Sequence, residues 1–302
     1  MIEKKSTPIY LYFIIVLIII TLGLIVLRIL LYFYSIISYV DDNKDIDYLI
    51  LIEGMKNGLI HFYDSVKISK WPPYYLYFWY FLFFPMYLLP VEVGLYVWDI
   101  LRLLSVSYVF IKARAVFKNT FDLIIFYLTC SVGYIYDAFF NNVNFLIFLF
   151  VFLSYKFLEE DKKWIAGIFF TLSTFKINSL IFLPLLLIIR KIKLKDLTYF
   201  LVPFFLICIP YMLFPNYFMQ MLNNWGHNDE DVQGLLITDS ITWKALQPTH
   251  LMLIGFLIFI FLENLENISM ETKKNFFRIM LPTMIGMYYL YLTIIVFIPQ
   301  IQ

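Results

Sequence analysis

Residues 9–38 read IYLYFIIVLIIITLGLIVLRILLYFYSIIS, an apolar run that is almost unbroken. A bilayer core requires about 20 helical residues, so this run is long enough to cross a membrane as one helix. It lacks the small-residue cleavage site of a signal peptide, and we therefore interpret it as a retained span. The stretch predicts an integral membrane protein.

The rest of the 302-residue chain has the same character. Hydrophobic residues make up 62% of it, aromatic residues 21% and charged residues 15%, and the mean hydropathy is +0.80. Soluble domains carry roughly a quarter charged residues. Long apolar blocks alternate with short charged loops, without the alternating strands of a barrel, so helices must satisfy the backbone in lipid. Cys130 and Cys208 lie inside apolar blocks and are expected to be free thiols.

The pattern predicts an all-α, polytopic transmembrane helical bundle with about 9–10 membrane segments. We treat residues 1–302 as a single integral membrane domain. Residues 163–190 fit either one bent element or two short ones. The predicted spans are 9–38, 74–90, 91–111, 121–140, 142–158, 163–176, 177–190, 196–214, 249–263 and 277–298.

Basic residues mark the cytoplasmic side of a membrane protein. If the basic loops all lie inside, the acidic loop 41–73, the turn near 141–144 and the loop 215–248 lie on the extracytoplasmic side. This parity requires the proline-broken stretch 74–90 to enter the membrane and return without crossing, which we prefer to a full crossing. The basic residues are Lys4, Lys5, Lys112, Arg114, Lys118, Lys162, Lys163, Arg190, Lys191, Lys193, Lys195, Lys273, Lys274 and Arg278.

The acidic stretch DDNKDIDYLILIEGMKNG at 41–58 follows the first apolar run. Its apolar spacing predicts an amphipathic interfacial helix in the first extracytoplasmic loop, with Asp45 capping the start. A solvated loop with a helix cap explains the same residues equally well. Lys176 lies where an apolar stretch turns, and an ionisable group there is a functional candidate. A lysine that snorkels to the interface is the alternative.

Two further polar features interrupt apolar runs. DAFFNNVN contains Asp137, Asn141, Asn142 and Asn144, although a plain turn would have a similar sequence. In WDILRLL, the third residue after Asp99 is an arginine, which predicts a structural ion pair on one helix face.

Several short motifs occur in a characteristic order. They are DIDY at 45–48, Gly58, Tyr63, Pro72-Pro73-Tyr74-Tyr75, Leu88-Leu89-Pro90, NNVN at 141–144, and FK at 175–176 followed by Leu183-Pro184-Leu185. Together they resemble membrane glycosyltransferases of the C superfamily. The closest resemblance is to glycosyltransferase family eighty-seven and to the catalytic subunit that adds the first mannose to glycosylphosphatidylinositol. In that subunit an aspartate-x-aspartate-tyrosine element opens the first extracytoplasmic loop.

The resemblance covers residues 10–190, which we assign as the catalytic module, and leaves 191–302 as variable C-terminal membrane segments. Family members often have a glycine or glutamine before the asparagine of NNVN, and this chain has Asn141 and Asn142 instead. The resemblance implies an inverting glycosyltransferase, above all a mannosyltransferase, that uses a polyprenyl- or dolichyl-phosphate sugar. A lipid-linked or glycan acceptor would receive the hexose on the extracytoplasmic side of a plasma membrane or endoplasmic reticulum.

The resemblance also implies roles for particular residues. Asp45 or Asp47 would take the proton of the acceptor hydroxyl; we favour Asp45, with Asp47 positioning substrate or a cation, and the reverse order stays open. The same pair could hold Mg²⁺ or Mn²⁺, since members of the superfamily differ in metal need. Lys176, Lys67 and Lys70 would stabilise the donor phosphate. The expected substrate-cavity residues are Tyr48, Tyr63, Tyr74, Asn142, Asn144, Trp225 and His227.

Other functions fit the sequence less well. A transporter or flippase usually shows related halves with charged groups near the midplane, whereas here there is no clear internal repeat and the acidic residues cluster at one side. A catalytically inactive relative of the glycosyltransferases is a second alternative. Nucleic-acid binding has no support, since the sequence shows no basic face away from the cytoplasmic loops.

Overall fold

The structure is a computed structural model that describes residues 8–34, 44–64, 72–117, 120–225 and 251–264. Every regular element within these ranges is a helix, which confirms the all-α prediction. The predicted span 277–298 lies outside the described residues. Cys130 and Cys208 are free, as expected.

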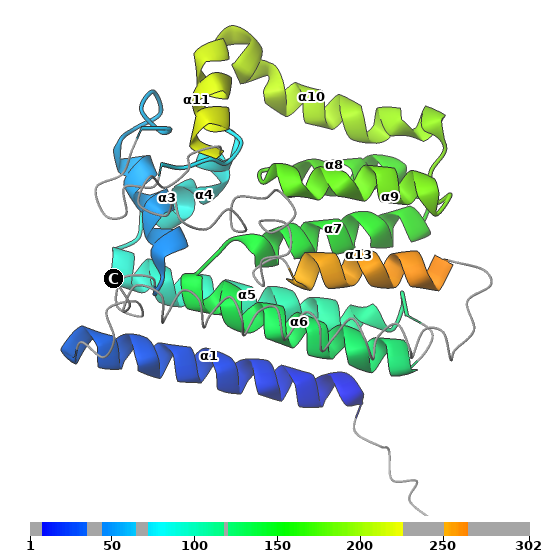
Figure 1. The fold of residues 1–302 in the computed structure, drawn as a ribbon, viewed down its shortest axis with the longest axis horizontal. Coiled ribbons are helices and arrows are strands. Elements are labelled where there is room, and N and C mark those ends of the chain that lie inside the picture. The colour runs from blue at the N-terminus through cyan, green and yellow to red at the C-terminus, as the bar shows by residue number, and fades with distance from the viewer. Residues whose placement is uncertain (1–7, 35–43, 65–71, 118–119, 226–250, 265–302) are drawn as a thin grey trace, which may run out of the picture.

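The long helices run side by side in a bundle (Figure 1). Within the described ranges, four helical stretches are long and apolar enough to cross a membrane: α1 (Ile9–Phe33), α5 (Val91–Ala113), α6 (Thr120–Phe140) and Leu194–Leu213. The last stretch joins η2 (Leu194–Leu197) to α10 (Thr198–Leu213). Shorter helices complete the bundle, namely α7 (Asn144–Glu159), α8 (Lys163–Ser173), α9 (Phe182–Ile188) and α13 (Leu251–Asn264).

The stretch 74–90 does not form a spanning helix. Its helix, α4 (Trp79–Tyr87), has 9 residues, which is about 14 Å at the α-helical rise. A bilayer core is about 30 Å thick, so α4 cannot cross it alone. The stretch 163–190 is two short elements, because α8 ends at Ser173 and η1 (Ile177–Ile181) then leads into α9.

The predicted interfacial helix is α3 (Ile46–Lys56), which lies at one end of the bundle near α4 and α11 (Pro215–Trp225) (Figure 1). It buries Tyr48, Leu51, Ile52 and Met55 on one helix face, and Ile50 on the opposite face is buried as well. The prediction that Asp45 caps this helix is wrong. Its backbone is left-handed (φ 67°) and its carboxylate makes no cap hydrogen bond, because ion pairs described below engage it instead. Helix α11 lies within the predicted loop 215–248.

Two glycines allow helices to approach closely. A Cβ on Gly167 of α8 would lie 1.8 Å from the Tyr199 carbonyl oxygen, and a Cβ on Gly94 of α5 would lie 1.9 Å from the Tyr48 hydroxyl. The first contact packs α8 on α10. The second lets α3 pack on α5, which brings the residues at the start of α3 close to the bundle.

Charged side chains occur at both ends of the bundle, with basic loops at one end and the acidic α3 segment at the other. At one end, Lys191 pairs with Glu159 at 2.6 Å and Lys163 with Asp196 at 3.2 Å, close to the loops after α7 and α9. At the other end lie α3 and the turn between α6 and α7 (Figure 1). The described basic loops therefore lie opposite the acidic α3 segment, as the distribution of charges predicts.

Candidate active site

The turn between α6 and α7 is the centre of the candidate site. Asn141 adopts a left-handed conformation (φ 53°), which asparagine tolerates better than most residues. The indole of Trp98 donates to the carbonyl oxygens of Asn141 and Asn142 at 3.2 and 3.3 Å. The backbone N–H of Asn142 donates to the backbone carbonyl oxygen of Asp137 at 2.8 Å. These bonds fix the turn, so the two asparagine side chains have defined positions.

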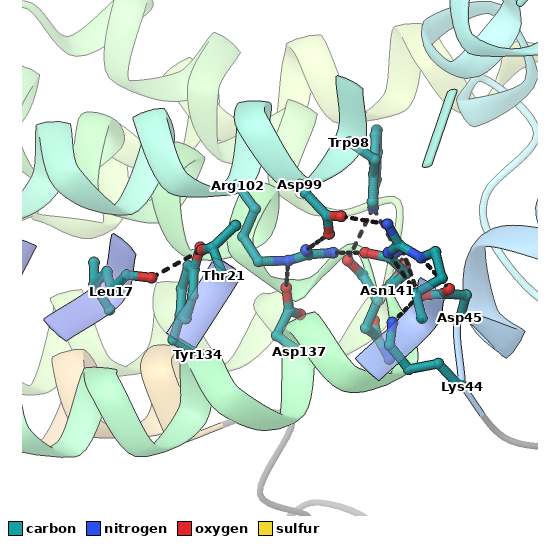
Figure 2. Close-up of polar contacts among 12 residues, drawn as sticks. Leu17, Thr21, Lys44, Asp45, Trp98, Asp99, Arg102, Tyr134, Asp137 and Asn141 are labelled. Carbon is teal, nitrogen blue, oxygen red and sulfur yellow. Dashed lines mark hydrogen bonds and ion pairs between the residues drawn. The ribbon is translucent and has the colours of Figure 1, made fainter. Parts of the chain in front are cut away.

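At this turn, both carboxylate oxygens of Asp45 already have hydrogen-bond donors (Figure 2). Its carboxylate accepts hydrogen bonds from Arg28 Nε at 2.6 Å, Arg28 Nη2 at 3.0 Å and Asn141 Nδ2 at 2.8 Å, and it pairs with Lys44 Nζ. The residue is 4% exposed. Its backbone amide donates to the Phe139 carbonyl at 3.0 Å, which holds the start of α3 against the end of α6.

The ion pairs continue from Asp45 into the bundle. Arg28 Nη1 lies 2.7 Å from Asp99 Oδ2, and Arg102 Nη1 lies 2.9 Å from Asp99 Oδ1, which confirms the predicted Asp99–Arg102 pair. Arg102 Nε also contacts Asp137 Oδ2 at 2.8 Å. A third contact of Arg102 is a bond from Nη2 to Asn141 Oδ1.

This set of residues forms one network, which we call the frame network. Its three basic and three acidic side chains balance in charge, and it connects α1, α3, α5 and α6 (Figure 2). Its members are Arg28, Lys44, Asp45, Asp99, Arg102, Asp137 and Asn141.

A second group of contacts surrounds Lys176, in the connection between α8 and η1. Lys176 Nζ donates to Asn142 Oδ1 at 2.8 Å and to Asn144 Oδ1 at 3.2 Å. Asn142 Nδ2 donates in turn to Asp47 Oδ2. The structure thus brings together Asp47, Asn142, Asn144 and Lys176, four residues that the sequence pattern had indicated. We call this group the Lys176 cluster.

Two tyrosines from the segment before α4 complete the Lys176 cluster. The ammonium group lies 5.8 Å from the ring centre of Tyr74 and 5.4 Å from that of Tyr75. The two rings stack on each other at 4.8 Å. Cation–π contacts of this kind favour the charged form of a buried lysine.

Burial shifts the titration of both charged members of the cluster. Burial raises the pKa of the Asp47 carboxyl, while the charge of Lys176 and the hydrogen bond from Asn142 act in the opposite direction. Burial lowers the pKa of Lys176, against the attraction of Asp47 and Asp137. By accessible surface Asp47 is half-buried and Lys176 is buried. A carboxylate with a raised pKa is better matched to proton transfer near neutral pH.

The other predicted site residues lie elsewhere. Tyr48 packs in the core, with its ring 5.5 Å from Phe83 and 5.9 Å from Trp98. The Tyr63 hydroxyl donates to the Tyr75 carbonyl at 2.7 Å. It also contacts the Tyr211 hydroxyl of α10. Trp225 ends α11; its side chain, like Lys67, Lys70 and His227, lies outside the described residues.

Sequence reasoning missed Arg28 and Lys44. Arg28 is the one charged residue of the run 9–38, and an arginine inside a predicted span is itself a sign of a buried partner. Lys44 precedes Asp45 directly and resembles an ordinary loop lysine, so no sequence signal distinguishes it. Burial lowers its pKa to about 8, despite its contact with Asp45.

The suggested metal site does not fit this arrangement. Both oxygens of Asp45 accept hydrogen bonds from Arg28, and one of them also contacts Lys44. Asp47 binds a different partner, Asn142. Within the described part of the chain no group of three or more histidine, cysteine or acidic residues is placed to hold a metal ion.

Comparison with known proteins identifies the family of the chain. The model of glycosyltransferase family 87 matches residues 74–262. The match covers more than half of the chain and includes Tyr74, Tyr75, the turn 141–144 and Lys176. Searches of curated proteins and of solved structures find no match. This match and the four helices that are long and apolar enough to cross a membrane show that the chain belongs to glycosyltransferase family 87 and is a membrane glycosyltransferase.

Proposed function

We propose that the protein transfers a hexose from a polyprenyl-phosphate donor to a hydroxyl group of a lipid-linked or glycan acceptor. Mannose is the sugar that we favour. The observation that carries this proposal is the Lys176 cluster, in which a half-buried carboxylate and a buried amine share one amide at the end of a membrane bundle. The similarity to the enzyme that starts mannosylation of glycosylphosphatidylinositol stays a prediction.

Lys176 has the character of an anion-binding residue. Arg28, Lys44 and Arg102 each make a direct ion pair with an aspartate. Within the described residues, Lys176 Nζ is instead bonded to the neutral amide oxygens of Asn142 and Asn144. An ammonium group without a direct carboxylate partner can make strong charge-assisted bonds to a phosphate. It would stabilise the charge that the phosphate gains as it leaves.

We infer that Asp47 is the general base, which reverses the order favoured from the sequence. Asp45 already accepts bonds from Arg28, Lys44 and Asn141, so an acceptor hydroxyl would have to displace one of them. Asp47 is half-buried, and Asn142 is the side chain within hydrogen-bond distance of it in the described part of the chain. Its second carboxylate oxygen is therefore the better proton acceptor.

The proposed reaction is a single displacement. The acceptor oxygen attacks the anomeric carbon and forms the new glycosidic bond, while the bond from that carbon to the phosphate oxygen breaks. The hydroxyl proton moves to Asp47, and the bonding electrons leave with the phosphate beside Lys176. One displacement inverts the anomeric centre. A positioned base contributes about 10²- to 10⁴-fold to such a step.

The distribution of charge supports an extracytoplasmic site. The described basic loops lie at the end of the bundle opposite α3 (Figure 1), and basic loops favour the cytoplasmic side. A polyprenyl phosphate keeps its phosphate at the membrane surface, which is where α3 and the turn 141–144 would lie. The 9-residue length of α4 supports a stretch 74–90 that enters the membrane and returns, which is what the predicted parity of the spans requires.

Purified protein in lipid nanodiscs should transfer radiolabel from polyprenyl-phosphate mannose, with glucose as a second donor and nucleotide sugars for comparison. Membrane lipid extracts would supply acceptors. Transfer from the lipid-linked donors and not from the nucleotide sugars supports the proposal. Use of a nucleotide sugar contradicts it, and the absence of turnover with every donor favours an inactive relative.

Lys176→Met should lower kcat/KM for the lipid-linked donor by about 100-fold or more, because the departing phosphate loses its positive partner. Lys191→Met is the matched control. Lys191 pairs with Glu159 at the opposite end of the bundle, so this variant should retain wild-type transfer. Equal activity of the two variants would remove Lys176 from the reaction.

A further inference from the structure

Two adjacent asparagines make the same kind of connection to different partners. Asn141 accepts a bond from Arg102 through Oδ1 and donates to Asp45 through Nδ2. Asn142 accepts from Lys176 through Oδ1 and donates to Asp47 through Nδ2. Each amide therefore lies between one buried cation and one aspartate.

The chemistry of the partners sets the orientation of each amide. Arginine and lysine side chains only donate hydrogen bonds, and an ionised carboxylate only accepts them. If the Asn142 amide were rotated by half a turn, its NH₂ group would face Lys176 and its oxygen would face Asp47, so both bonds would be lost. The backbone amide of Val143, which donates to Asn142 Oδ1 at 2.7 Å, favours the same orientation.

We propose that Asn142 is a positioning residue that keeps Asp47 and Lys176 ionised together and aimed at one reaction centre, whereas Asn141 serves the frame network. The proposal rests on the proposed function for the roles of Asp47 and Lys176. Asn142 bonds to the charged form of both groups, and bonds to a charged form favour that form. Loss of the amide should therefore make each group easier to neutralise.

Other groups near Asp47 contribute to its titration and stay in place in the variants. The Lys176 charge favours ionisation of Asp47. Asp137 of α6 and the tyrosines before α4 lie within electrostatic range of the cluster. The charged and titratable groups that face Asp47 are thus Lys176, Asp137, Tyr74 and Tyr75.

Asn142→Ala should narrow the pH profile of kcat from both sides. The acidic limb should move up by about one pH unit as Asp47 loses a donor, and the alkaline limb should move down as Lys176 loses an acceptor. Asn142→Ser is a second variant should the alanine protein fold poorly. A purely structural role predicts a similar fold-loss at every pH, and that result would overturn the proposal.

Asn141→Gly is the matched control. Glycine accepts the left-handed backbone at this position, and the substitution removes the neighbouring amide. This variant should lower the apparent Tm and leave both limbs of the pH profile where they are in the wild type. A shift equal to that of Asn142→Ala would show that the two amides are not distinct in function.

A second measurement does not depend on transfer. The hydrogen bond from Asn142 stabilises the fold while Asp47 is ionised, and this contribution is lost as the pH falls through the raised pKa of Asp47. The Tm difference between wild type and Asn142→Ala should therefore be larger at pH 8 than at pH 5, and this increase with pH should disappear in an Asp47→Asn background. A pH-independent difference with Asp47 present overturns the inference, even if no donor is found.

Discussion

Asp47→Asn is expected to reduce sugar transfer by about 10²- to 10⁴-fold, the usual contribution of a general base, with little change in apparent Tm. The asparagine keeps the size of the side chain and removes its ability to take a proton. Because burial raises the pKa of Asp47, wild-type kcat should also fall with decreasing pH at a value above the ordinary carboxyl pKa of about 4. Transfer assays over a pH series would check both expectations.

The variant Asp45→Asn distinguishes the role of Asp45 from that of Asp47. This substitution leaves Arg28 and Lys44 without their shared carboxylate, so its first effect should be a lower Tm. Any loss of transfer should accompany that loss of stability. If Asp45→Asn is fully stable and inactive while Asp47→Asn remains active, the base is Asp45 and our assignment is wrong.

Arg102→Leu should destabilise the protein strongly, because it removes the most deeply buried cation of the frame network. Arg102 is 0% exposed and contacts Asp99, Asp137 and Asn141. Removing one partner of a buried ion pair costs about 3–5 kcal/mol, since the remaining charges stay buried without compensation. We expect a strongly lowered Tm or no folded protein, measured by thermal unfolding in detergent.

Lys162→Met provides the comparison for Arg102→Leu. Lys162 pairs with Glu160 at the surface, with a side chain that is 51% exposed, and exposed pairs contribute about 0–1 kcal/mol. Its Tm should stay close to that of the wild type. If Arg102→Leu unfolds at the same temperature as Lys162→Met, the frame network does not stabilise the fold.

The apolar runs predicted most of the fold because a bilayer imposes simple rules on helix length. Helices α1, α5 and α6 begin and end close to the predicted limits. The stretch around α4 required the pattern of basic loops as well, because aromatic and proline residues are apolar yet do not guarantee a continuous helix. Hydropathy alone cannot distinguish a short helix with an extended approach from a full span.

The sequence predicted which residues belong to the candidate site better than it predicted which of them contact each other. Asn142 and Lys176 are predicted because they interrupt apolar stretches, and Asp47 is predicted from the DIDY motif at 45–48. The choice between Asp45 and Asp47 depended on Arg28, which is distant in sequence from both and lies inside an apolar run. The same ion pair explains why Asp45 does not cap α3, since the charged guanidinium of Arg28 is a stronger partner than a backbone amide.

A structure of the protein with a polyprenyl-phosphate mannose analogue bound would test the central claim most directly. We predict that the phosphate lies within hydrogen-bond distance of Lys176 Nζ and that Asp47 is closer than Asp45 to the anomeric carbon. A phosphate bound away from Lys176, or an anomeric carbon beside Asp45, would contradict the account.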